Sequence, residues 1–78
     1  MTLTNVDQIV DARGLACPMP IVKTAQAIKA MASGQVLEVL ATDAGSVRDF
    51  QAWSRSTGNA LIEMTEEVGI YRFLLQKK

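Results

Sequence analysis

Twice along the chain, a segment with the composition or alternation of a β-strand is followed by one with apolar residues every three or four positions, as in a helix. This alternation limits the possible fold classes more than any other feature of the sequence. Residues 6–12 (VDQIVDA) are rich in β-branched side chains and indicate a first strand. Over residues 18–32, apolar side chains recur every three or four positions, as on one face of a helix: Ile21, Ala25, Ile28 and Ala32. We expect Gly34 to end this helix.

The second half of the chain repeats the change of period. Residues 35–41 predict a strand with Leu37, Val39 and Ala41 on one face, followed by a turn. Ser46 and Asp49 resemble a capping box at the start of a second helix, which we expect to end at Gly58. Residues 60–66 and 70–76, joined by a short connection around Gly69, are typical of an antiparallel hairpin.

The predicted order is therefore β-α-β-α-β-β, an α+β fold. A chain of 78 residues supports one domain, spanning 1–78. Two helices cannot cover both faces of a four-stranded mixed sheet, so we expect a two-layer sandwich with both helices on one face. Glu38 and Glu63 alternate with apolar positions and should lie on the open face.

Composition excludes several classes of function. Eight basic residues balance eight acidic ones, which counts against nucleic acid as a partner. The apolar runs are too short to span a membrane and the first residues do not resemble a secretory signal, so we expect a cytoplasmic protein. One cysteine without histidine predicts no metal site, and the sequence contains no motif for a nucleotide cofactor.

Cys17 is the only cysteine and lies in the stretch GLACPMP, where Pro18 and Pro20 mark the start of the first helix. We expect Cys17 at the N-cap, Pro18 at N1 and Pro20 at N3, leaving the Met19 N–H to face the sulfur. A thiol at a helix N-terminus should have a lowered pKa, and we expect it to be exposed and reactive.

The alternative is that Cys17 only packs a core, because free cysteine is among the most buried residue types. The flanking prolines favour function, since they place the thiol in a loop at the start of an element. Arg13 and Lys23 are two cations near it in sequence that could add positive potential or help dock a partner.

Three blocks of sequence resemble the TusA family of small sulfur-carrier proteins, also described as SirA-like. Residues 11–20 (DARGLACPMP) are similar to the family signature, residues 41–50 (ATDAGSVRDF) to its second block, and Trp53 with Thr57-Gly58 to its third. A common variant of the third block has a cysteine and a histidine where this chain has Ser54 and Asn59.

The resemblance implies that Cys17 carries sulfur as a persulfide or thiosulfonate, with the same β-α-β-α-β-β sandwich. It implies a donor such as a cysteine desulfurase or a rhodanese-like protein, and a DsrE-like acceptor. Members serve transfer RNA thiolation, molybdenum-cofactor synthesis or sulfur oxidation, and the sequence does not choose among them. Whether to class such a carrier as an enzyme stays uncertain, because it does not turn over a substrate alone.

The remaining motif residues have two interpretations. Asp11 and Gly14 are expected to shape the Cys17 loop. Asp43, Arg48 and Asp49 either help dock a partner and orient that loop or are an ordinary turn residue, a solvated charge and a capping residue.

Two other functions stay open. The first is a redox-sensitive binding or regulatory module that uses the open sheet face. The second is an RNA-binding module, against which the zero net charge and few aromatic residues count.

Overall fold

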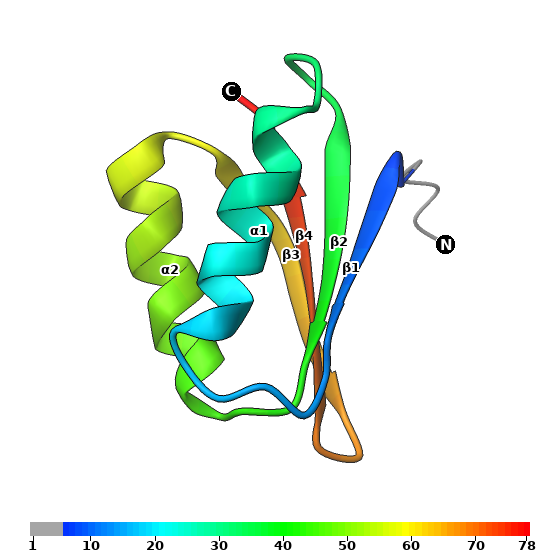
Figure 1. The fold of residues 1–78 in the computed structure, drawn as a ribbon, viewed down its shortest axis with the longest axis vertical. Coiled ribbons are helices and arrows are strands. Elements are labelled where there is room, and N and C mark those ends of the chain that lie inside the picture. The colour runs from blue at the N-terminus through cyan, green and yellow to red at the C-terminus, as the bar shows by residue number, and fades with distance from the viewer. Residues whose placement is uncertain (1–5) are drawn as a thin grey trace.

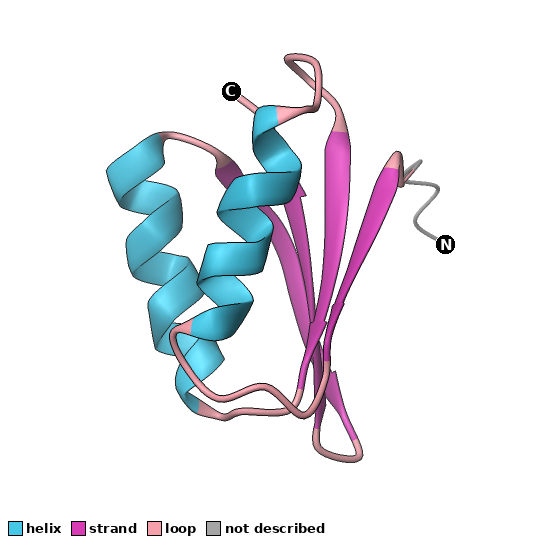
Figure 2. Cartoon of the chain, in the orientation of Figure 1, coloured by secondary structure: helices cyan, strands magenta, loops and turns pink. Residues whose placement is uncertain are grey.

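The computed structural model describes residues 6–78 and has the predicted order of elements (Figure 1). The helices and strands are β1 (Gln8–Ala12), α1 (Met19–Lys29), β2 (Val36–Ala41), α2 (Gly45–Thr57), β3 (Ala60–Glu67) and β4 (Ile70–Gln76). Both helices lie on one side of the sheet, which confirms the two-layer α+β sandwich (Figures 1 and 2). Neither described helix is long and apolar enough to cross a membrane.

The sheet has the strand order β1-β2-β4-β3. β1 pairs with β2 in parallel, and β4 pairs antiparallel with both β2 and β3, so the sheet is mixed. A parallel pair needs a crossover connection, and α1 provides it. The carboxyl ends of β1 and β2 therefore meet at the same edge of the sheet, and the loops that lead into α1 and α2 lie there together (Figure 1).

The core lies between the sheet and the helices. Leu37, Val39 and Ala41 are fully buried on the face of β2 that was predicted to be apolar. Phe73 of β4 is the register partner of Val39 and stacks on Phe50 of α2, with ring centroids 4.4 Å apart. Burial of these side chains fixes α2 against the centre of the sheet.

The open face of the sheet carries the predicted acidic residues. Arg72 of β4 lies between them, with its Nε 2.7 Å from Glu38 Oε1 and an outer guanidinium nitrogen 3.6 Å from Glu63 Oε2. Leu74, the register partner of both glutamates, is only 2% exposed. The charged side chains thus cover an apolar residue in the middle of the open face.

Helix α1 is shorter than predicted, and Gly34 does not end it. The helix ends at Lys29, and its last carbonyls are bound from the end of the chain: Lys77 Nζ donates to the carbonyl oxygens of Ile28 at 2.9 Å and Lys29 at 3.4 Å. Met31 turns into the core, where it is 6% exposed. Tertiary contacts, which the local pattern does not reveal, decide this boundary.

Helix α2 ends at Gly58 as predicted, with φ of +82° and its N–H bonded to the Ser54 carbonyl at 2.9 Å. The predicted capping box at its start is wrong. The N-cap is Ala44, and Ser46 is fully buried inside the first turn. The carboxylate of Asp43 takes over part of the capping role, since its Oδ1 accepts the Gly45 N–H at 3.0 Å.

Candidate functional site

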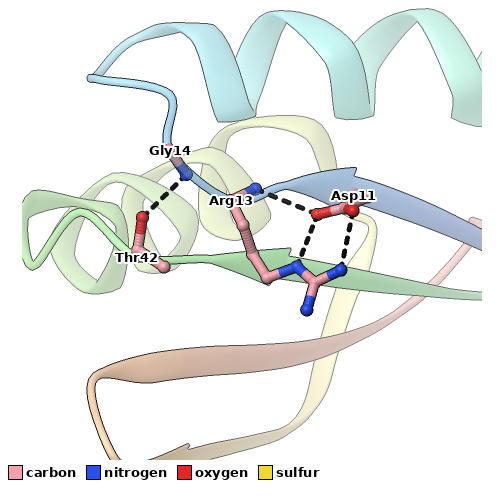
Figure 3. A network of polar contacts seen from close by, with 4 residues as sticks. All are labelled: Asp11, Arg13, Gly14 and Thr42. Atoms are coloured by element: carbon pink, nitrogen blue, oxygen red, sulfur yellow. Dashed lines mark hydrogen bonds and ion pairs between the residues drawn. The ribbon is translucent and has the colours of Figure 1, made fainter.

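Cys17 lies in the loop between β1 and α1, next to the loop between β2 and α2 (Figure 1). Two hydrogen bonds join the loops. The Gly14 N–H donates to Thr42 Oγ1 at 2.8 Å, and the Cys17 N–H donates to Asp43 Oδ2 at 2.8 Å. The first of these is drawn in Figure 3. Thr42 and Asp43, which are consecutive in the β2–α2 loop, therefore fix the β1–α1 loop that holds the thiol.

Asp11 and Arg13 pair with each other at the start of this loop (Figure 3). The guanidinium binds both carboxylate oxygens, at 2.8 and 2.9 Å, and the Arg13 N–H donates to the same carboxylate at 3.1 Å. The hydrogen bonds from Arg13 lower the pKa of Asp11 to about 2. The positive charge of Arg13 is thus neutralised locally, and Asp11 tightens the turn into the Cys17 loop.

The predicted helix start is off by one residue. Pro18 is the N-cap, so Cys17 precedes the cap, and Pro20 is the second residue of α1. The Met19 N–H, which was expected to face the sulfur, donates to the Ala16 carbonyl at 2.9 Å. Because a tight turn uses this donor, the first turn of α1 does not solvate the thiol as predicted.

The thiol is half-buried and faces α2 instead. It borders a hollow lined by Cys17, Asp43, Ala44, Gly45, Val47, Arg48, Asp49 and Gln51. Ser46 Oγ lies 3.9 Å from the sulfur, from a side chain with no exposed area. A Cβ atom placed on Gly45 would lie 3.4 Å from the sulfur. Glycine at 45 therefore keeps the space beside the sulfur free.

The prediction of a lowered thiol pKa is wrong in this structure. The Asp49 carboxylate is the largest of the causes that raise the pKa of Cys17 to about 11, and burial and Asp43 act in the same direction. Ser46 opposes them, because a hydroxyl that donates to the sulfur stabilises the thiolate. The free protein accordingly holds Cys17 as a thiol at neutral pH.

Of the other predicted site residues, Asp43, Arg48 and Asp49 line the hollow at Cys17, whereas Lys23 lines a second hollow between β1 and α1. The N–H groups of Cys17 and Gly45 lower the pKa of Asp43, which suits an acceptor of two hydrogen bonds. Sequence reasoning missed Thr42, Gly45 and Ser46. They contact the cysteine loop only through the fold, and Ser46 was read as a cap because of its position.

The described residues, 6–78, contain no group of three or more histidine, cysteine, aspartate or glutamate side chains that could hold a metal ion. The chemistry that this hollow offers is that of a single sulfur atom. The backbone N–H of Cys17 anchors the residue to Asp43. The sulfur lies within hydrogen-bonding distance of Ser46 Oγ on one side and borders the hollow on the other. Such an atom can form and break one covalent bond to sulfur.

Comparison with known proteins agrees with this geometry. The family described as sulfurtransferase TusA matches residues 8–77. The chain is 51% identical over 75 residues to the sulfur carrier protein TusA of Allochromatium vinosum, covering 96% of this chain and 99% of that protein. It is 54% identical over 71 residues to a putative sulfur carrier protein, YrkI, of Bacillus subtilis, covering 91% and 95%.

A solved structure shares the fold. The crystal structure of a SirA-like protein from Desulfitobacterium hafniense superposes with a TM-score of 0.77 at 22% identity, over 88% of this chain and 95% of that one. The match of residues 8–77, together with relatives of about the same length and half-identical sequence, shows the family. This chain belongs to the TusA family and is a sulfur carrier.

Proposed function

We propose that Cys17 carries sulfane sulfur as a persulfide and that residues 1–78 act as one carrier domain. The observation that carries this proposal is the position of the single cysteine. Its thiol borders a hollow at the meeting point of the two helix-leading loops, and its backbone is fixed by Asp43. A carrier needs one sulfur that a partner can reach and that returns to the same place after each transfer.

The transfer is a thiol–persulfide exchange. The Cys17 sulfur attacks the outer sulfur of a persulfide on the donor protein, a new sulfur–sulfur bond forms, and the bond between the donor's two sulfurs breaks. The donor cysteine leaves as a thiolate and takes up the proton that Cys17 loses. Neither oxidant nor reductant is consumed. In the second transfer, the thiol of the acceptor attacks the outer sulfur of the Cys17 persulfide, and Cys17 is the leaving thiolate.

A sulfur carrier works with a donor and an acceptor, and we propose their classes from the resemblance. The donor is a cysteine desulfurase or a rhodanese-like protein, and the acceptor is a sulfur-relay protein of the DsrE type. The sulfur then reaches transfer RNA thiolation, molybdenum-cofactor synthesis or sulfur oxidation. The reducing cytoplasm suits a thiol that must stay free between transfers.

The test is the mass of the intact protein after incubation with a cysteine desulfurase and cysteine. We expect wild type to gain the mass of one sulfur atom, and Cys17→Ser to gain none. Loading of Cys17→Ser would overturn the assignment of Cys17. The binding-module alternative predicts a different pattern, in which no adduct forms on wild type and partner binding is the same with and without the thiol.

A further inference from the structure

The charges around the Cys17 sulfur are predominantly negative. Three charged side chains line its hollow, namely Asp43, Arg48 and Asp49. The two carboxylates are half-buried and Arg48 is exposed. Asp43 is held against the cysteine by the backbone hydrogen bond, and Asp49 lines the same hollow as the thiol and raises the pKa of Cys17. A group attached to the sulfur therefore enters a hollow lined by two carboxylates and one guanidinium, of which the carboxylates are the more buried.

Two residues of the first turn of α2, Gly45 and Ser46, lie beside the sulfur. Ser46 Oγ lies 3.9 Å from it, and the backbone of Gly45 is close enough that an added Cβ would lie at 3.4 Å. Asp49 follows these residues within the first turns of α2 and lines the same hollow. An outer atom bonded to the sulfur can therefore project into the hollow that the Asp49 side chain also lines.

Two kinds of outer group differ in charge at this place. A persulfide ends in a single sulfur, which is anionic when ionised but can also bear a proton and donate it to a carboxylate. A thiosulfonate ends in a sulfonate, the anion of a strong acid, which stays ionised at neutral pH and can only accept hydrogen bonds. Like charges at short distance repel, and a half-buried position weakens the screening by water.

We propose that Asp49 is a specificity-determining residue that, together with Asp43, disfavours sulfur adducts of Cys17 that end in an anionic sulfonate. The inference rests on the proposed function of Cys17. It implies that sulfur arrives by exchange with a persulfide of another protein, in which the group transferred is a bare sulfur atom. Polythionates are then poor sources, because their transfer leaves a sulfonate in the hollow that Asp49 lines.

The competing reaction is fully defined. The Cys17 thiolate attacks a central sulfur of tetrathionate, the bond between the two central sulfurs breaks, and thiosulfate leaves with the electron pair. The product is Cys17 thiosulfonate, and the thiol proton goes to the solvent. The incoming ion has two negative charges and the adduct keeps one, so both the approach and the product are sensitive to Asp49.

The experiment compares the rate of Cys17 modification by tetrathionate with that by iodoacetamide, a neutral reagent, at one pH. Both reagents react with the thiolate, so the ratio of the two rates cancels any change in thiol pKa. We expect Asp49→Asn to raise the tetrathionate to iodoacetamide ratio by about three- to tenfold, the effect of one charge on a dianion at short range. Gln51→Glu, which adds a carboxylate to the hollow, should lower it.

A distant substitution serves as the matched control. Glu67 lies at the tip of the β3–β4 hairpin, so Glu67→Gln removes the same charge from the protein and should leave the ratio unchanged. Salt dependence of the wild-type ratio is a second test that needs no variant. Raising salt from about 0.01 M to about 1 M shortens the Debye length from about 30 Å to about 3 Å. This screens the repulsion between the carboxylates and tetrathionate, so the tetrathionate to iodoacetamide ratio should rise.

An equal ratio in wild type and Asp49→Asn, with no dependence on salt, would overturn the inference. This outcome is distinct from failure of the proposed function. If the desulfurase loads no sulfur on wild type, Cys17 is not a persulfide carrier, whatever the ratio. If loading is normal and the ratio is insensitive to Asp49, the carrier function stands and Asp49 does not select its cargo.

Discussion

The backbone N–H of Cys17 donates to Asp43 Oδ2 at 2.8 Å, although 26 residues separate the two in sequence. The other oxygen of the same carboxylate accepts the Gly45 N–H at 3.0 Å, so Asp43 holds the cysteine loop and the start of α2 at once. The carboxylate thereby fixes the distance between the sulfur and the helix that lines its hollow.

Asp43→Ala should slow sulfur loading by about ten- to a hundredfold, because a displaced nucleophile loses its alignment with the donor persulfide. The rate of mass gain with a desulfurase and cysteine measures this. Asp7 is a matched control, since its carboxylate also accepts a backbone N–H, that of Val36 at 2.8 Å, outside the Cys17 site. Asp7→Ala should lower the melting temperature and leave the loading rate of folded protein unchanged; equal losses of rate would refute a positioning role for Asp43.

The thiol of Cys17 should titrate far above free cysteine, whose pKa is about 8.5. Because Asp49, burial and Asp43 together raise the pKa of Cys17 to about 11, the rate of alkylation by iodoacetamide should have its midpoint near that pH, and Asp49→Asn, which removes the largest cause, should lower the midpoint. Asp11→Asn should not move it, since the Asp11 carboxylate is paired with Arg13. A wild-type midpoint at or below that of free cysteine would contradict the structure.

The same shift predicts how stability depends on pH. The folded state binds the thiol proton more tightly than the unfolded state, so its contribution to stability is complete below the unfolded pKa. That contribution decreases as the pH rises from the unfolded value towards about 11. Cys17→Ser lacks the ionisation, so denaturant titrations between these pH values should show a smaller loss of stability in the variant than in wild type.

Gly58 ends α2 with φ of +82°, a conformation that costs a residue with a Cβ atom about 1–2 kcal/mol. Gly58→Ala should lower the free energy of unfolding by about that amount in a denaturant titration. The new Cβ would also lie 2.9 Å from Lys78 Cδ, the far part of a flexible side chain that can move.

Gly34→Ala separates the cost of the backbone conformation at Gly58 from the cost of the contact with Lys78. Its φ is +89°, and among the described residues no atom lies within 4 Å of an added Cβ. Gly34→Ala should therefore cost nearly as much as Gly58→Ala. A much larger loss at Gly58 would mean that Lys78 cannot move aside.

Local sequence predicted the fold well because it encodes the spacing of apolar residues and the glycines and prolines that mark the ends of elements. The alternation of Leu37, Val39 and Ala41 identified the buried face of β2, and Gly58 identified the end of α2. The motif around Cys17 identified the loop, because two prolines mark an element boundary in any fold. These features depend on neighbours in the chain.

The surroundings of the thiol depend on neighbours in space, and there prediction failed. A helix N-terminus alone favours a thiolate, but the carboxylates of Asp43 and Asp49 come from the β2–α2 loop and α2, and they reverse the direction of the pKa shift. Ser46 has the sequence position of a capping residue, yet its side chain is buried beside the sulfur. A single sequence does not reveal such a pairing.

Arg72 should stabilise the open face mainly by packing and by pairing with Glu38, whose side chain is 15% exposed. Arg72→Ala should lower the free energy of unfolding by about 1–2 kcal/mol, because it uncovers Leu74 and leaves a partly buried carboxylate without its cation. Arg72→Met keeps most of the apolar stem and should cost less. Glu63→Gln should cost under about 1 kcal/mol, since that pair is 3.6 Å apart and more exposed. Denaturant titrations of the three variants give this order; equal losses for Arg72→Ala and Arg72→Met would assign the whole effect to charge.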